Sequence, residues 1–216
     1  EKQYEEKAPF NMKTFFKGFY VDPRTYPDFV WFLLVTFLLM LGFYCVLDFM
    51  QYYLEDILHS QSPAQHTALV SGAAVIGGAI ISFFVGKISD TIGKRKTVTI
   101  AALLMASTAL VLIFQPSVPV VIAMSIVFGI GYGMFVSIQW SIVTDCLPSA
   151  ESSAKDMGIW TVAIILPQVI APYIGKAMFG LFSYKGLGFA YQMLFLMVFI
   201  FEVLGGIFIY RVKKTT

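Results

Sequence analysis

The chain has 216 residues, of which 58% are hydrophobic and 13% are charged, and its formal net charge is +2. Soluble domains carry about 25% charged residues, so this chain lacks the polar side chains needed to cover a water-soluble globule of its size. The same composition excludes a disordered chain, and the nearly balanced charge leaves no basic patch for a nucleic acid. The two cysteines, Cys45 and Cys146, lie far apart in or beside apolar runs, which excludes a disulfide scaffold and a cysteine-rich metal site. We therefore expect a membrane protein.

The first 27 residues form a segment of mixed character. Residues 1–7 are mostly charged, and no apolar core with a cleavage site follows them, so the segment is not a signal peptide. Aromatic side chains then alternate with Lys13 and Lys17. This pattern fits a cytoplasmic segment that lies on the membrane interface, and it fits a mobile linker equally well.

Six apolar runs follow, each of about the 20 residues that a helix needs to cross the hydrocarbon. They lack the alternation of barrel strands, and only helices or closed barrels span a membrane. The sequence therefore predicts an all-α, polytopic membrane protein with a transmembrane domain at residues 28–211 and a tail at 212–216. The predicted spans are 29–53, 67–88, 97–114, 118–143, 157–182 and 187–210.

The Lys and Arg residues indicate the orientation, because cytoplasmic loops are enriched in them. With the N-terminus in the cytoplasm, 13 of the 15 Lys and Arg residues fall on the cytoplasmic side, and only Lys176 and Lys185 fall on the other. We expect both termini to be cytoplasmic.

The connection between the second and third spans carries a spaced pattern of glycine, acid and base. It resembles the signature loop of the major facilitator superfamily, although Thr91 stands where that family usually has Arg or Lys. A plain positive-inside loop would also be rich in cations. The resemblance implies that Asp90 bonds to neighbouring helix ends and holds one conformation. The matching residues are Gly86, Asp90, Gly93, Lys94, Arg95 and Lys96.

A second block, residues 129–175, is similar to the C-terminal half of sugar-transporter-like facilitators, which are related to the glycoside and sucrose symporters. The resemblance implies a fold of one six-helix half, built from two inverted three-helix repeats. It also implies a secondary transporter that moves a small polar solute, such as a sugar, by alternating access. The expected partners are the lipid bilayer, the solute with or without a proton, and an N-terminal six-helix half or a second copy of this chain. The alternative is a non-transporting six-span scaffold or regulatory protein.

One candidate substrate site lies in the first span. Tyr44, Asp48 and Gln51 follow helical spacing and form one polar and aromatic stripe. Such a stripe can line a cavity and bind sugar hydroxyls. An aromatic belt with polar groups at the interface would give the same pattern.

Further candidates lie in the fourth and fifth spans. Gln139 offers amide hydrogen bonds and Trp140 an apolar ring face for a sugar. In the fifth span, Pro167 removes a backbone hydrogen bond beside Gln168 and predicts a kink. Gly129 and Gly133 are spaced for close helix contact, so we interpret them as packing residues.

Glu202 lies near the middle of the last span. A carboxylate in hydrocarbon is costly unless it faces protein or water, so Glu202 and Asp48 are candidates for proton coupling. Glu202 fits equally well as a neutral or paired structural acid.

The sequence argues against an enzyme. It contains no Gly-x-Ser-Gly setting for an intramembrane serine protease, and its two histidines, His59 and His66, lie in or beside one outer loop. Because no cysteine accompanies them, we expect no metal site and no cofactor.

Overall fold

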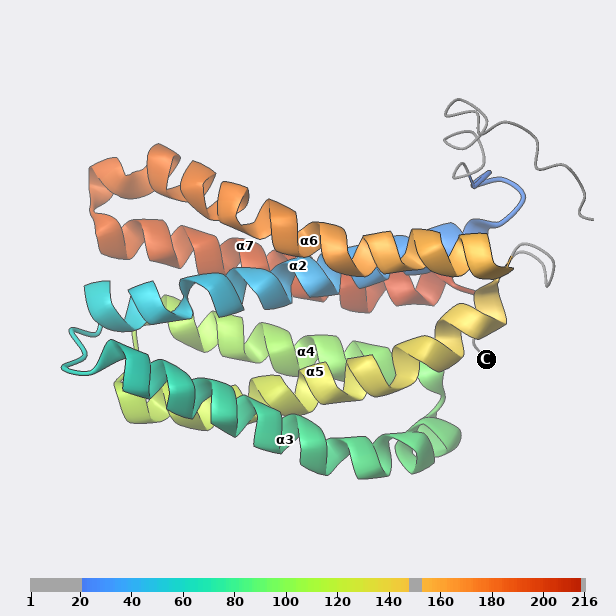
Figure 1. Ribbon diagram of the computed structural model, residues 1–216, viewed down its shortest axis with the longest axis horizontal. Helices are drawn as coiled ribbons and strands as arrows, with labels where there is room; N and C mark the ends of the chain where they lie inside the picture. Colours follow the sequence, from blue (N-terminus) through green and yellow to red (C-terminus); the bar gives the residue numbers. More distant parts are fainter. Residues whose placement is uncertain (1–20, 148–152, 215–216) are drawn as a thin grey trace, which may run out of the picture.

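A computed structural model describes residues 21–147 and 153–214. Residues 1–20, which hold most of the predicted interfacial segment, lie outside the described residues. The long helices are arranged side by side as a bundle (Figure 1). In the described residues they are α2 (Pro27–Asp56), α3 (Pro63–Ile92), α4 (Lys94–Ile113), α5 (Val118–Cys146), α6 (Ser153–Phe182) and α7 (Leu187–Phe208), with short 3₁₀ turns η1 (Ser183–Lys185) and η2 (Ile209–Arg211).

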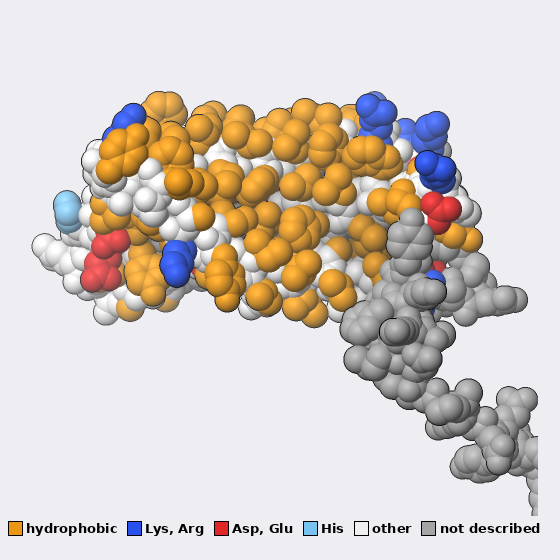
Figure 2. Space-filling model, turned by 90° about the horizontal axis from the view of Figure 1, so that it is seen from above, with side chains coloured by type: hydrophobic (Ala, Val, Ile, Leu, Met, Phe, Trp, Pro, Cys, Tyr) orange, Lys and Arg blue, Asp and Glu red, His pale blue; other side chains and the backbone are white. Residues whose placement is uncertain are grey.

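The predicted all-α class and its six spans are confirmed. Each helix begins and ends within four residues of its predicted span, and all six are long and apolar enough to cross a membrane. Figure 2 shows a broad band of hydrophobic side chains, with Lys, Arg, Asp and Glu gathered toward the two ends of the molecule. The chain is an integral membrane protein.

Proline and glycine mark the helix ends. Pro27 and Pro63 occupy the first turns of α2 and α3, where the missing N–H would have had no partner within the helix. Gly93 alone separates α3 from α4, and its φ of 90° lies in the region that favours glycine. The predicted loop at 86–96 is therefore almost entirely helical, with a sharp reversal at Gly93.

The helix pairs follow a reciprocal pattern. The helix α3 packs mainly on α5, while α6 packs mainly on α2; α4 contacts both α5 and α7, and α7 contacts both α4 and α2. Exchanging α2–α4 for α5–α7 leaves this set of main contacts unchanged. Two three-helix repeats of inverted topology produce this pattern.

The closest helix contact joins α3 to α5 through glycines. A Cβ atom placed on Gly133 would lie 2.6 Å from the Cα of Gly78, and one placed on Gly77 would lie 2.5 Å from the carbonyl oxygen of Ile126. Such distances leave no room for a side chain, so the two backbones touch directly. The prediction that Gly129 and Gly133 are packing residues agrees with this geometry, since Gly129 meets the backbone of Ala74 in the same way.

Buried side chains form two clusters, one toward each end of the bundle. One cluster contains Phe29 and Trp160, and the other contains Tyr53 and Tyr191. Tyr44 and Tyr132 are partly buried and pack against both clusters. These last two residues therefore mark the middle of the bundle, between its two ends.

The helix α6 continues through Pro167 and Pro172. Figure 1 shows it bent along its length rather than broken. A proline inside a helix removes one backbone hydrogen bond and pushes the preceding turn aside, which accounts for a bend without a separate loop.

The α3–α5 contact gives a direct test. We expect Gly133→Ala to lower stability by about 1–3 kcal/mol, because the added methyl group must push the two backbones apart. Thermal unfolding of the purified protein in detergent measures the change. Gly72→Ala on α3 is the matched control, since nothing lies within 4 Å of a Cβ atom at Gly72. Equal melting temperatures for the two variants would contradict the close contact.

Candidate functional site

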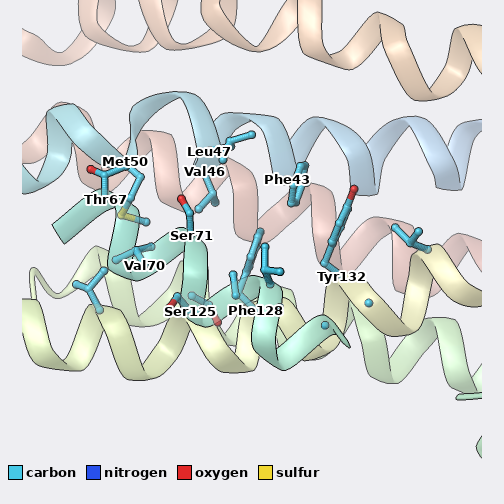
Figure 3. Close-up of a pocket in the computed structure, with 18 of the residues that line it drawn as sticks. Phe43, Val46, Leu47, Met50, Thr67, Val70, Ser71, Ser125, Phe128 and Tyr132 are labelled. Atoms are coloured by element: carbon cyan, nitrogen blue, oxygen red, sulfur yellow. The ribbon is translucent and has the colours of Figure 1, made fainter. Parts of the chain in front are cut away.

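A groove of about 390 Å³ lies between α2, α3 and α5 (Figure 3). Two α4 residues, Thr108 and Leu112, close its floor. Most of the lining is apolar, and its polar groups are hydroxyls: Thr67, Ser71, Ser82, Thr108, Ser125 and Tyr132.

Most of these hydroxyls already donate a hydrogen bond inside the protein. Thr67, Ser82 and Ser125 donate to carbonyl oxygens of their own helices at 2.6–2.8 Å. Thr108 donates to the carbonyl oxygen of Met124 at 3.2 Å. A hydroxyl carries a single proton, so this part of the groove offers acceptors and apolar surface but few donors.

The predicted substrate residues lie outside the groove lining. On α2, Tyr44 and Asp48 are half-buried and Gln51 is exposed. On α6, Gln168 is exposed. The α2 stripe is therefore accessible along its length, and its exposure increases toward the outer end of the helix.

Gln139 and Trp140 follow one another in the sequence but face different surroundings. Gln139 is buried, and its side-chain oxygen has no hydrogen-bond partner among the described residues. Trp140 is 55% exposed, and its ring meets the fully buried ring of Trp160 edge to face at 4.5 Å between centroids. Trp140 can offer a ring face to a ligand, whereas Gln139 points into the protein.

An aromatic contact joins α2 to α5 at the middle of the bundle. The rings of Phe43 and Tyr132 stack with their centroids 3.9 Å apart and their planes 11° apart, and Tyr44 meets Phe43 edge-on at 5.3 Å. Figure 3 shows the Tyr132 hydroxyl directed toward α2. This arrangement places two phenol groups and a flat apolar surface near the middle of the bundle. Aromatic faces with a few polar groups are typical of small-molecule sites.

The two acids that the sequence singled out have different environments. Asp48 is half-buried on α2, while Glu202 on α7 has no exposed surface. The Glu202 carboxyl group lies directly over Gly42, and neither of its oxygens has a hydrogen-bond partner among the described residues. An ionised acid at the bilayer centre costs at least about 2.5–3.5 kcal/mol, so burial without a hydrogen-bond partner disfavours the ionised form of Glu202.

Residues 32–216 match a sequence profile of the Major Facilitator Superfamily. The chain belongs to this superfamily. The predicted family is thereby confirmed, and with it a place among membrane transporters.

Three curated relatives show similarity over parts of the chain. The arabinose-proton symporter of Bacillus subtilis (strain 168) is 36% identical over 98 residues, which are 45% of this chain and 21% of the symporter. Monosaccharide-sensing protein 3 of Arabidopsis thaliana is 24% identical over 97 residues, which are 45% of this chain and 13% of that protein. The uncharacterized MFS-type transporter YwfA of Bacillus subtilis (strain 168) is 27% identical over 165 residues, which are 76% of this chain and 38% of YwfA. The chain thus spans well under half the length of each of these relatives.

The superfamily's signature pattern lies where α3 turns into α4. Gly86 and Asp90 belong to the last turns of α3, and the cations open α4. Lys94 forms an ion pair with Asp145 at the end of α5. Asp90 is exposed, and within the described residues no hydrogen bond or ion pair reaches it. In this conformation Lys94, rather than Asp90, makes the contact to a neighbouring helix end.

The remaining cations of the pattern lie beside the C-terminal tail. Arg95 donates a hydrogen bond to the carbonyl oxygen of Lys213 at 2.5 Å, while Lys96 is exposed. Asp28, in the first turn of α2, accepts hydrogen bonds from the backbone N–H groups of Lys213 and Lys214 at 2.7 and 3.2 Å. The tail therefore connects the starts of α2 and α4.

Sequence reasoning passed over Tyr132 and Phe43. Tyr132 lies between Gly131 and Gly133, and the spacing of the glycines in this segment predicts helix packing rather than a binding role. It is the only tyrosine of α5 and lies at the middle of that helix, which is the signal that would have identified it.

The different environments of Gln139 and Trp140 can be tested by labelling. In a background of Cys45→Ala and Cys146→Ala, we expect Trp140→Cys to react with a water-soluble maleimide and Gln139→Cys to resist it. Mass spectrometry of the labelled protein measures both. The two sites are neighbours and serve as each other's control, so a faster reaction at position 139 would contradict the orientation of α5.

The ion pair between Lys94 and Asp145 has a salt-dependent signature. Their side chains are 29% and 35% exposed, so we expect Lys94→Glu to lower stability by about 1 kcal/mol at low salt and by less at high salt. Thermal unfolding at two ionic strengths measures the effect. The exchanged pair, Lys94→Glu with Asp145→Lys, should recover most of the loss; a double variant no more stable than Lys94→Glu would show that the pair does not matter.

Proposed function

We propose that this chain works as one six-helix half of a secondary transporter that carries a small polar solute, a sugar, across a membrane by alternating access. The observation that carries the proposal is the stripe of Tyr44, Asp48 and Gln51 on α2, which remains accessible on a helix whose apolar segment is half buried in the bundle. A polar stripe facing lipid would be costly, so we assign it to the wall of a solute path. Membership in the superfamily and the similarity to an arabinose-proton symporter support a sugar as the solute.

The solute site in this proposal combines the α2 stripe with aromatic rings from α5. Tyr44 and Tyr132 supply phenol groups at the middle of the bundle, and Asp48 lies one helical turn beyond Tyr44. Trp140 and Gln168 supply an exposed ring and an exposed amide from α5 and α6. Sugars need both kinds of group, because their hydroxyls form hydrogen bonds while their C–H faces pack on aromatic rings.

A second six-helix unit is required to enclose such a path. The helices α3 and α6 have only 17% and 22% of their most apolar segments buried, against 39–50% for the other four. Their open faces are where we propose that an N-terminal half, or a second copy of this chain, packs. Transport then consists of one unit tilting against the other around the solute site.

The orientation and the coupling ion belong to the same proposal. Both ends of the described chain lie at one end of the bundle (Figure 1), and that end carries most of the described Lys and Arg residues. We assign this end to the cytoplasm. Asp48 is the acid that we assign to proton coupling, because a coupling group must exchange its proton with water.

Replacing the half-buried acid tests the function. We expect Asp48→Asn to reduce proton-driven uptake of labelled arabinose by about tenfold or more, since hydrogen bonds to a charged group are worth about 1.5–3 kcal/mol. Uptake is measured in membrane vesicles with an imposed pH gradient, with and without a protonophore.

The matched control is Asp22→Asn. Asp22 precedes α2, and hydrogen bonds from Thr25 and from the Arg24 N–H lower the pKa of its carboxyl group, so it is charged at neutral pH but lies outside the spans. Asp22→Asn should transport like the wild type. Unchanged uptake in Asp48→Asn, at equal protein levels, would remove Asp48 from the solute path.

A further inference from the structure

Glu202 is a fully buried acid within α7 that the proposed transport path does not use. It is fully buried on α7, and its carboxyl group fills the space that Gly42 leaves by having no side chain. One turn further along α7, Gly205 and Gly206 let Leu39 of α2 and Ala102 of α4 approach closely. Glu202 therefore lies in a tight three-helix contact of α2, α4 and α7.

Among the described residues, no positive side chain pairs with this acid. On α2 the nearby titratable groups are Tyr44, Cys45 and Asp48, none of which carries a positive charge. On α4 no titratable side chain lies between Lys96 and the end of the helix. Along α7 and the η2 turn that follows it, the nearest are Tyr210 and Arg211, more than two turns beyond Glu202, and Tyr191, about three turns before it. The Arg211 guanidinium lies over the ring of Trp31, and the Tyr191 hydroxyl donates to Asp56. An ionised Glu202 would thus have neither water nor a counter-charge.

We propose that Glu202 is a positioning residue: its neutral carboxyl group, seated over Gly42, fixes α2 against α7 and so sets the place of Tyr44 and Asp48 in the solute path. The proposal rests on the proposed function, because it assigns Glu202 to support the site rather than to carry the coupled proton. Gly42 precedes Tyr44 by two residues and Asp48 by six, so a displacement of α2 at Gly42 moves both side chains.

The shape of the contact explains why an acid can serve here. Helix association in lipid depends on close van der Waals contact and on hydrogen bonds. The flat carboxyl group is thin enough to lie on the α2 backbone where Gly42 has no Cβ atom. A glutamine amide has nearly the same shape and no charge in any protonation state. It therefore separates a packing role from a proton-carrying role.

The first experiment compares three substitutions in the complete protein in membrane vesicles. We expect Glu202→Gln to keep the uptake rate and the pH profile of the wild type, whereas Glu202→Ala raises the KM for arabinose at least several-fold. Gly42→Ala should also raise the KM, because its new methyl group overlaps the carboxyl group of Glu202. If Glu202→Gln abolishes uptake or flattens the pH profile, Glu202 carries a proton and the proposal is wrong.

The double variant Gly42→Ala with Glu202→Ala tests the contact itself. Removing the carboxyl group makes room for the methyl group, so the double variant should bind arabinose better than Gly42→Ala alone. A double variant as poor as the product of the two single effects would show that the two residues act independently, and would overturn the proposal.

The labelling rate of a cysteine thiol tests the contact between Glu202 and Gly42 without any solute. Cys45 is fully buried on α2, about one turn from Gly42, and Cys146→Ala leaves it as the only thiol. We expect N-ethylmaleimide to label Cys45 slowly in the wild type and in Glu202→Gln, and clearly faster in Glu202→Ala. Equal labelling in all three would contradict the positioning role. If the wild type takes up no sugar, the proposed function fails, and the labelling result still decides whether Glu202 holds α2 in place.

Discussion

Close contact between helices holds this bundle together. In lipid, apolar side chains gain little by leaving the solvent, so association depends on van der Waals packing and on hydrogen bonds between helices. The contact of α3 with α5 through Gly78, Gly129 and Gly133 follows from this constraint. The reciprocal contact of α6 with α2 also relies on a glycine, because Gly175 lies against the ring of Phe49. The architecture depends on where side chains are missing as much as on where they are large.

The same constraint sorts the polar groups of the spans. Hydroxyl groups such as those of Thr67 and Ser82 donate hydrogen bonds to carbonyl oxygens of their own helices, so they need no partner from a neighbouring helix or from water. A carboxylate has no proton to donate to a backbone carbonyl oxygen, so its own helix cannot satisfy it in this way. Asp48 remains accessible, while Glu202 is enclosed over Gly42. Two acids of the spans thus lie in opposite environments, which is why the proposed function assigns proton exchange to Asp48 and a positioning role to Glu202.

The sequence predicts the fold closely, because the thickness of the bilayer fixes how long an apolar run must be. Helix ends were predicted to within four residues; α3 extends beyond its predicted span at both ends, to Pro63 and to Ile92 beside Gly93. The surroundings of the individual site residues are harder to predict from the sequence. Gln139 and Trp140 are adjacent, yet one is buried and the other exposed, because successive residues of a helix point about 100° apart. Which of them faces a path depends on how α5 is rotated against α3 and α4. That rotation follows from packing with distant segments, and it is not visible in a short motif.

Contacts at both ends restrict movement within the six-helix unit. At one end Asp28 and Arg95 connect the tail to α2 and α4, and Lys94 connects α4 to α5. At the other end Tyr191 donates to Asp56, and Tyr53 donates to the carbonyl oxygen of Leu112 at 2.9 Å. Between them, Phe43 and Tyr132 join α2 to α5. Helices fixed at both ends and in the middle move together more easily than past one another. In the function proposed above, a change of access would therefore come from tilting this unit against a second one, and the bent helix α6, on the open face, is the element best placed to contact that second unit.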